Sequence, residues 1–319
     1  MKKTLGIILI CAVICLAYFW SLLSLTRQME RKAVLDQQAI IAANLLEDLD
    51  SFIYHNMLNI QLIAQNDAFA QYFAGKLDAD SAHDALQRMS LQTGPWYAIA
   101  IFDLQGKVVL STSTKLQNRN IENSGLEEQR AYTFALSNQL TTSDLYYSPV
   151  IDKPVMIVSA PISLAIKGSG SKVVGVMMGY LAWPTVNKII GDVQIPAALL
   201  NSKSEVIAST QTPRQNESSP RWSLLSLQRV FRDESFSEVL SPKQTIFGEE
   251  AYVSGATERG YLRFHGHGWV IILEQPLSLV FGSGNQQVIK YTFGLVGFAV
   301  FVMFVVIVVA VVLHWKNRT

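Results

Sequence analysis

Two long apolar segments, one at each end, constrain this 319-residue chain more than any other feature. Residues 4–25 and 291–313 run for 22 and 23 residues without a charged side chain. An α-helix rises about 1.5 Å per residue, so each segment reaches roughly 33 Å, and the hydrocarbon core of a bilayer is about 30 Å thick. The sequence therefore predicts two transmembrane helices. A signal peptide is the alternative for the first segment, but the run is too long for a usual h-region and no small-x-small cleavage site closes it.

Basic residues outside the two segments predict the orientation. Lys2 and Lys3 precede the first segment, and Lys316 and Arg318 follow the second. Basic flanks favour the cytoplasmic side, and long domains are translocated largely regardless of their charge, so the cations that begin at Arg27 do not reverse the orientation. We expect residues 1–3 and 314–319 in the cytoplasm of a bacterium, two spans in its inner membrane, and the central region in the periplasm or outside the cell.

The 264 residues between the two segments carry 25 acidic and 22 basic side chains, a formal net charge of −3. A nucleic-acid partner would require a strong basic excess, so we expect none. Both cysteines, Cys11 and Cys15, lie in the first segment, so the central region uses no disulfides, which favours a bacterial envelope over a secreted eukaryotic scaffold.

Catalytic and metal-binding patterns are missing from the sequence. The five histidines and the serines form no Ser-His-Asp, Gly-x-Ser-x-Gly or His-Glu-x-x-His arrangement, so we expect neither an enzyme nor a cofactor. His265 and His267 are spaced like two ligands on one strand face, but no cysteine or third ligand accompanies them, and a glycine-rich turn is the simpler interpretation.

A long helix is predicted to continue from the first transmembrane segment over residues 26–75. No proline or glycine occurs from Thr26 to Phe73, and apolar residues recur at steps of three and four. We expect this helix to form a stalk near the membrane and a packed spine farther out. A second helix is predicted over Ser81–Leu91. The recurring apolar positions are Ala42, Leu46, Leu49, Ile53, Met57, Ile60 and Ala64.

An apolar–turn–apolar unit then occurs twice, at an offset of 98 residues. Tyr97–Ser113 and Ala198–Thr210 align without gaps, so that Asp103 meets Asn201 and Ser111-Thr112 meets Ser209-Thr210. Chance similarity between two hairpins is the alternative. Each unit is followed by a predicted helix and two strands, which indicates an α+β fold with antiparallel sheets. These elements are Leu126–Gln139, Pro154–Pro161 and Lys172–Leu181 after the first unit, and Trp222–Arg229, Glu250–Ala256 and Trp269–Glu274 after the second.

Over residues 30–285 the chain resembles the double Cache sensor domain, the extracytoplasmic ligand-binding region of bacterial chemoreceptors, sensor kinases and diguanylate cyclases. The resemblance rests on the long helix and on the segments YAIAIFDLQGKVVLSTS, EEQRAYTFALSNQLTTSDLYYSPVIDKPVMIVSAPI, KVVGVMMGYL and GHGWVIILEQPLS. It implies two tandem PAS-like modules on one helical spine, a membrane-distal module over 76–190 and a membrane-proximal module over 191–288. The distal module is the one that usually holds a small ligand.

The resemblance also implies site residues. Members that sense amino acids carry an Arg-x-Trp motif, a Tyr and an Asp near the next strand, and an Asp on the last strand. Arg130-Ala-Tyr132 resembles the motif with Tyr in place of Trp, Asp152 resembles the second carboxylate, and Tyr180 occupies the position of the third. A tyrosine there supplies only a hydroxyl and a ring face, which leaves recognition of an α-amino acid open.

Three tyrosines besides Tyr132 are candidates for the pocket walls, namely Tyr97, Tyr147 and Tyr180. Each residue also has a structural interpretation. Arg130 is equally compatible with a surface arginine paired with Glu127 or Asp152, the tyrosines with ordinary core, and Asp152 with a turn before Lys153-Pro154.

The resulting hypothesis is a sensor that binds a small ligand, of an identity the sequence does not specify, and passes the signal through its transmembrane helices. We expect a homodimer. Only six residues follow the second segment, so the output domain is expected either in a longer receptor, of which this chain is a fragment, or in a separate cytoplasmic or membrane partner. The alternative is a membrane-anchored accessory protein that binds an envelope protein instead of a metabolite.

Overall fold

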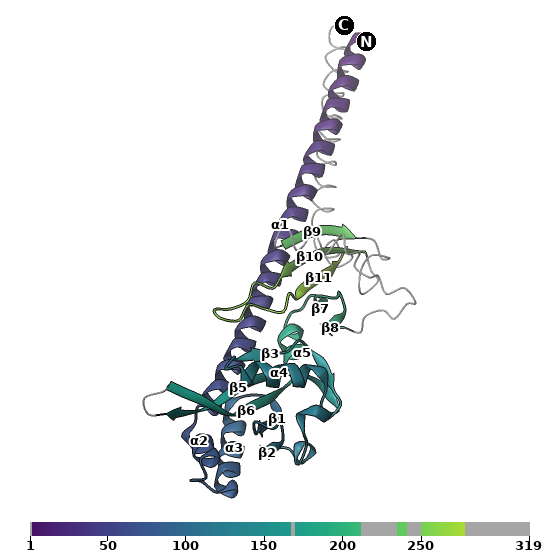
Figure 1. The fold of residues 1–319 in the computed structure, drawn as a ribbon. Helices are drawn as coiled ribbons and strands as arrows, with labels where there is room; N and C mark the ends of the chain where they lie inside the picture. Colours follow the sequence, from purple (N-terminus) through teal and green to yellow (C-terminus); the bar gives the residue numbers. More distant parts are fainter. Residues whose placement is uncertain (1, 167–169, 212–234, 241–249, 278–319) are drawn as a thin grey trace.

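One long helix runs past two antiparallel sheets in the computed structural model, which describes residues 2–166, 170–211, 235–240 and 250–277 (Figure 1). This helix, α1, spans Lys2–Ala64 and is continuous through residues 4–25, as the sequence predicts. It ends earlier than expected. Asn66 accepts a hydrogen bond from the Ala68 amide at 3.0 Å and so caps a separate helix, α2 (Asp67–Phe73).

The predicted apolar stripe of α1 faces the core. All seven recurring positions are buried, and Leu45 and Ile63 extend the same face. This face packs against strands of both sheets, so α1 is the common support of the two halves of the fold. A further helix, α3 (Ala79–Thr93), encloses the predicted Ser81–Leu91 and is capped by Asp78, which accepts from the Ser81 amide at 2.8 Å.

The sheet of the module over 76–190, called the distal sheet after the position predicted for it, has the strand order β2-β1-β6-β5-β3, and β4 also pairs with β5. Its long central hairpin pairs Ile166 with Gly170 beside the predicted loop at Lys167; residues 167–169 themselves lie outside the described residues. The strands are β1 (Trp96–Phe102), β2 (Val108–Ser111), β3 (Thr141–Thr142), β4 (Tyr146–Ser148), β5 (Lys153–Ile166) and β6 (Gly170–Ala182).

Both faces of this sheet are covered, which explains why its central strands are nearly continuously apolar. One face, with Ile99, Val158 and Met177, belongs to the core that includes α1. The other face, with Ala98, Ile157 and Tyr180, packs under α4 (Leu126–Leu136). Two short 3₁₀ turns, Thr114–Leu116 and Ile121–Asn123, close the edge of this second layer.

The sheet of the module over 191–288, called the proximal sheet after the position predicted for it, has the order β8-β7-β11-β10-β9. In both sheets the last strand of the module therefore lies beside the first. Strand β9 was not predicted, and the predicted helix Trp222–Arg229 lies outside the described residues. The strands are β7 (Ala197–Leu200), β8 (Val206–Ser209), β9 (Ser235–Leu240), β10 (Ala251–Thr257) and β11 (Val270–Pro276).

The internal repeat is confirmed at the level of single hydrogen bonds. Asp103 Oδ1 accepts from the amides two and four residues later at 3.0 and 2.8 Å, and Asn201 Oδ1 does the same at 2.9 and 3.0 Å. Thr112 Oγ1 accepts from the Ile99 amide at 2.9 Å, and Thr210 Oγ1 accepts from the Ala197 amide at 2.9 Å. Each partner differs from its counterpart by 98 positions. Chance similarity of two hairpins does not explain this agreement.

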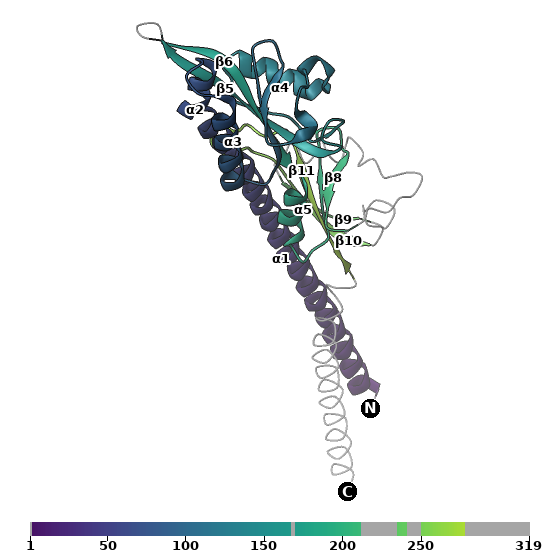
Figure 2. The ribbon, with the colours of Figure 1, turned by 90° about the horizontal axis from the view of Figure 1, so that it is seen from below.

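The two sheets share one apolar core along α1 (Figure 2). Trp183, at the start of α5 (Pro184–Gly191), meets Trp269 edge to face with 5.7 Å between ring centroids. The Trp183 indole also donates to the Ile207 carbonyl at 2.8 Å. The two modules are thus joined by packed aromatic rings as well as by the helix.

Within the described part of the chain, no helix has a stretch both long and apolar enough to cross a bilayer. The second predicted span, 291–313, lies outside the described residues.

Candidate functional site

A buried carboxylate lies between α4 and the distal sheet. Glu128 is 0% exposed although it stands in the first turn of a helix. One of its oxygens accepts from the Gly125 amide in a capping box, and Oε1 accepts from the Ser148 hydroxyl at 2.9 Å. A buried charge is costly unless it is paired or hydrogen-bonded, so these contacts offset part of its desolvation.

Two tyrosine hydroxyls surround this carboxylate. Tyr180 of β6 is completely buried, and its hydroxyl has no hydrogen-bond partner among the described residues. The Tyr146 hydroxyl is buried as well and finds no bond of regular geometry there, although Glu128 and Ser148 lie close to it. Burial, and secondly the negative charge of Glu128, raise the pKa of both phenols. Both groups therefore stay protonated and act as donors.

The arrangement provides a negatively charged acceptor beside two donors, all of them buried. Such a site can orient a small ligand that brings a cationic or donor group to Glu128 and an acceptor to Tyr180. Sequence analysis overlooked Glu128, because Glu-Glu-Gln-Arg at a helix start resembles a solvated first turn. The one sequence signal for Glu128 was its place as the third residue of the helix. From there a glutamate side chain can accept a hydrogen bond from the backbone amide of the N-cap residue.

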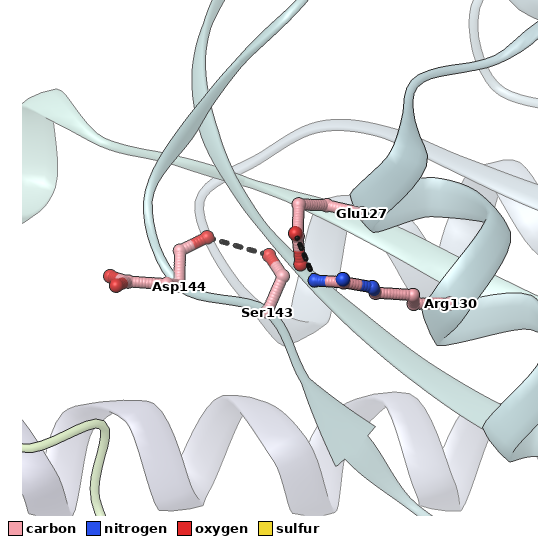
Figure 3. A network of polar contacts seen from close by, with 4 residues as sticks. All are labelled: Glu127, Arg130, Ser143 and Asp144. Carbon is pink, nitrogen blue, oxygen red and sulfur yellow. Dashed lines mark hydrogen bonds and ion pairs between the residues drawn. The ribbon is translucent and has the colours of Figure 1, made fainter.

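Arg130 is exposed, in contrast to the buried Glu128. Its guanidinium pairs with Glu127 at 2.9 Å, and its side chain is 59% exposed (Figure 3). This geometry corresponds to the surface arginine that the sequence left open as an alternative. The segment that follows β3 lies in the same view, where Ser143 Oγ donates to the Asp144 carbonyl at 2.8 Å (Figure 3). Participation of Arg130 in ligand binding stays a prediction.

The other predicted residues are divided between core and surface. Tyr132 lies on the same buried face as Tyr180, and its hydroxyl donates to the Asp103 carbonyl at 2.8 Å. Tyr97 is half-buried at the margin of that face, under the Lys153 ammonium at 4.4 Å. Tyr147 is exposed and donates to Asp152, which is also exposed.

Asp152 itself adopts a left-handed conformation with φ of 61°, which aspartate tolerates in turns. The structure therefore brings Tyr180 and Tyr132 together and places Arg130, Tyr147 and Asp152 at the surface. Whether any of the six binds a ligand stays a prediction.

The two histidines near β11 lie in a turn. Gly266 and Gly268 both have φ of 76°, a conformation that favours glycine. His267 Nε2 lies 3.0 Å from the Thr142 hydroxyl. In the portion of the chain that the structure describes, no three His, Cys, Asp or Glu side chains are grouped so as to hold a metal ion.

Comparison with solved structures identifies the fold. The ligand-binding domain of the Campylobacter jejuni chemoreceptor Tlp3, solved with 4-methylisoleucine, matches with a TM-score of 0.57 and 15% identity, over 79% of this chain and 94% of that one. The ligand-binding domain of the Pseudomonas fluorescens chemoreceptor CtaA, solved with L-isoleucine, matches with a TM-score of 0.54 and 14% identity, over 81% and 98%. No family profile matches the sequence. No curated protein matches it.

The predicted resemblance to double Cache sensor domains is thus confirmed at the level of the fold. The mixed helix and antiparallel-sheet architecture is that of sensory domains, and these neighbours are ligand-binding receptor domains and not enzymes. At identities of 14–15% the likeness concerns the fold and not the ligand.

Proposed function

We propose that this chain is a membrane-anchored extracytoplasmic sensor that binds a small ligand in the membrane-distal module, between α4 and the sheet. The observation that carries the proposal is the completely buried Tyr180 hydroxyl, which lacks a partner among the described residues and lies beside the buried Glu128. Buried polar groups in folded proteins are normally satisfied, so a missing partner indicates a group that a ligand supplies. The fold shared with ligand-binding domains of chemoreceptors supports the same interpretation.

The chemistry around Tyr180 favours a ligand with a cationic or donor group. Glu128 supplies a negative charge on the α4 side of the sheet, which is the charge that a carboxylate on the last strand would otherwise provide. An ammonium group facing Glu128, with an acceptor facing Tyr180, would satisfy both. A small amine or amino acid is therefore the class of ligand to test first.

Anchoring by two transmembrane helices is supported by the sequence of residues 4–25 and 291–313 and by the basic residues outside them. The central region is then periplasmic or extracellular, with the module over 76–190 farther from the inner membrane than the module over 191–288. The signal passes through the transmembrane helices to an output domain or partner.

A homodimer is supported by an exposed apolar stripe on α1. Tyr18, Met29, Ile40 and Leu62 are exposed and are spaced by 11, 11 and 22 residues. Eleven residues complete just over three helical turns, so these four side chains lie within an arc of about 80° on the side of the helix away from the core. A cysteine in place of Ile40 is expected to cross-link two copies. A cysteine in place of Asp48, exposed and about 80° around the helix, is the matched control.

The ligand hypothesis is tested by a thermal-shift screen of small amines and amino acids on the full chain, followed by calorimetric titration of the hits. Tyr180→Phe removes one hydroxyl and is expected to weaken binding about 3- to 100-fold. Its control is Tyr18→Phe, which removes the hydroxyl of an exposed tyrosine on α1, outside the candidate site.

A second pair compares adjacent glutamates on α4. Glu128→Gln is expected to abolish binding of a cationic ligand, and Glu127→Gln is not. If Tyr180→Phe and Glu128→Gln both bound the ligand with unchanged affinity, the ligand site would have to lie elsewhere in the chain. Unchanged affinity in Arg130→Ala would remove Arg130 from it. An absence of hits together with co-purification of an envelope protein would favour the accessory role instead.

A further inference from the structure

The connection between β10 and β11, residues 258–269, contacts both the distal module and α1. Toward the distal module, the Trp269 indole donates to Asp144 Oδ1 at 2.9 Å, and His267 bonds Thr142 at 3.0 Å. Toward α1, the ring of Tyr261 lies 5.7 Å from that of Tyr54. A side chain that holds this connection in place therefore also stabilises its contacts with the distal module and with α1.

Glu258 is the group that organises the connection. Its Oε2 accepts from the amides of His267 and Trp269 at 2.5 and 2.9 Å. Gly266 packs directly on the same carboxyl, since a Cβ added there would come within 2.7 Å of the Glu258 carboxyl carbon. The other oxygen, Oε1, is buried and receives no hydrogen bond from any described residue.

Asp50 of α1 faces Glu258. It is 1% exposed, and its Oδ1 is also buried without a donor in the described residues. The two carboxyl groups lie within hydrogen-bonding reach of each other, and the Gly260 amide approaches Asp50 from the same connection. Two ionised carboxylates are acceptors only, so neither can satisfy the other. A proton shared between the two carboxyl groups would turn one of them into a donor to the other.

The charges around the pair favour this proton. Glu47, on the same helix, adds a further negative charge to the environment of Asp50. His267, on the far side of Glu258, has its pKa lowered by burial, against the opposing effect of Glu258, Asp144 and Glu127. The connection also carries two arginines, Arg259 and Arg263, and Arg259 makes an interaction within the protein.

We propose that Asp50 and Glu258 share one proton, and that this proton binds the spine helix α1 to the β10–β11 connection and releases it at alkaline pH. The pair is a proton-binding site outside the ligand site. It is independent of the ligand that the distal module takes, so its failure would leave the proposed function intact.

Burial first, and then the Glu258 carboxyl, raise the pKa of Asp50 from its ordinary value of 3.8 to about 8. Because the folded state binds this proton and the unfolded state has already lost it, stability falls as the pH rises between these two values and then levels off. The native link itself keeps the proton until the pH approaches about 8, and it weakens only as that proton leaves.

The first test detects the proton itself. Infrared spectra of the full chain at about pH 6 are expected to show the carbonyl stretch of a protonated carboxylic acid, which disappears at about pH 9. Asp50→Asn and Glu258→Gln should each abolish that band, whereas Glu47→Gln, on the exposed side of α1, should retain it. Asparagine has nearly the shape of aspartic acid and can donate to Glu258, so the variant keeps the contact without the titration.

The second test follows stability. The unfolding temperature of the wild-type chain is expected to fall from about pH 6 to about pH 9, and that of Asp50→Asn to change clearly less. Glu47→Gln is the control that should follow the wild type. The proposal is overturned if the wild-type spectrum at the lower pH lacks a band that Asp50→Asn removes, or if Asp50→Asn and the wild type show the same pH dependence. The infrared result stands even where one variant fails to fold.

Discussion

Replacing Thr112 by valine removes a single hydroxyl on which the first β-hairpin depends. Thr112 Oγ1 accepts from the Ile99 amide at 2.9 Å, and the Thr112 amide donates to the Ile99 carbonyl at 2.9 Å. Valine keeps the shape of threonine and the second bond, but leaves the amide of the completely buried Ile99 without an acceptor. A buried donor without a partner costs about 1–3 kcal/mol of unfolding free energy.

The repeat supplies an internal replicate. Thr210 Oγ1 accepts from the Ala197 amide at 2.9 Å in the proximal module, and Ala197 is equally buried. Thr210→Val should therefore cost about as much as Thr112→Val. A loss of about 1 kcal/mol lowers the unfolding temperature by roughly 2–4 °C in a domain of this size. Thr133→Val on the surface of α4 is the control, and its effect should stay within about 0.5 kcal/mol.

Denaturant unfolding followed by circular dichroism gives the free energies, and hydrogen exchange shows where protection is lost. Peptides that contain Ile99 should exchange faster in Thr112→Val only, and peptides that contain Ala197 in Thr210→Val only. If Thr112→Val were as stable as the control, or if only one of the two repeat variants were destabilised, the reasoning from the shared hydrogen bond would be refuted.

Three further changes test the packing of the core, the junction and the buried histidine. Gly179→Ala places a methyl group 2.5 Å from Ile60 Cδ1 and should cost about 1–3 kcal/mol, whereas Gly191→Ala, with nothing within 4 Å, should be tolerated in the same denaturant titration. Trp269→Phe removes the bond to Asp144 and should lower the unfolding temperature, with faster exchange in the connection 258–269. Burial lowers the pKa of His267 below its ordinary 6.5, so stability should fall as the pH drops below that value. His267→Gln should reduce this acid dependence in a pH series of melting curves.

The long helix and the two hairpins could be predicted from the sequence because the spacing of their apolar residues reflects which side chains are buried. The apolar stripe from Ala42 to Ala64 and the twin hairpins follow from residues that contact their own core. Strand β9, SFSEVL, was missed because its apolar residues, Phe236, Val239 and Leu240, do not alternate regularly with polar ones. The end of α1 was missed because a single cap at Asn66, and no change of period, separates it from α2.

The candidate site was less accessible to sequence reasoning, because its residues are defined by tertiary contacts. Arg130 matched a motif, yet the geometry of α4 turns it toward Glu127. Glu128 looked like surface, yet the segment that carries Ser148 folds over it. The same is true of Asp50 and Glu258, which are 208 residues apart in the chain and show no pattern that would relate them.

α1 has a mechanical consequence for any signal that starts in the distal module. Its 63 residues measure about 95 Å, and it contains no proline and no glycine beyond Gly6. Kinks arise mainly at such residues, so beyond Gly6 α1 has no residue at which it would readily bend and absorb a displacement. Because strands of both sheets pack against α1, we expect a displacement at one end to move the whole helix, either along its axis or by rotation about it.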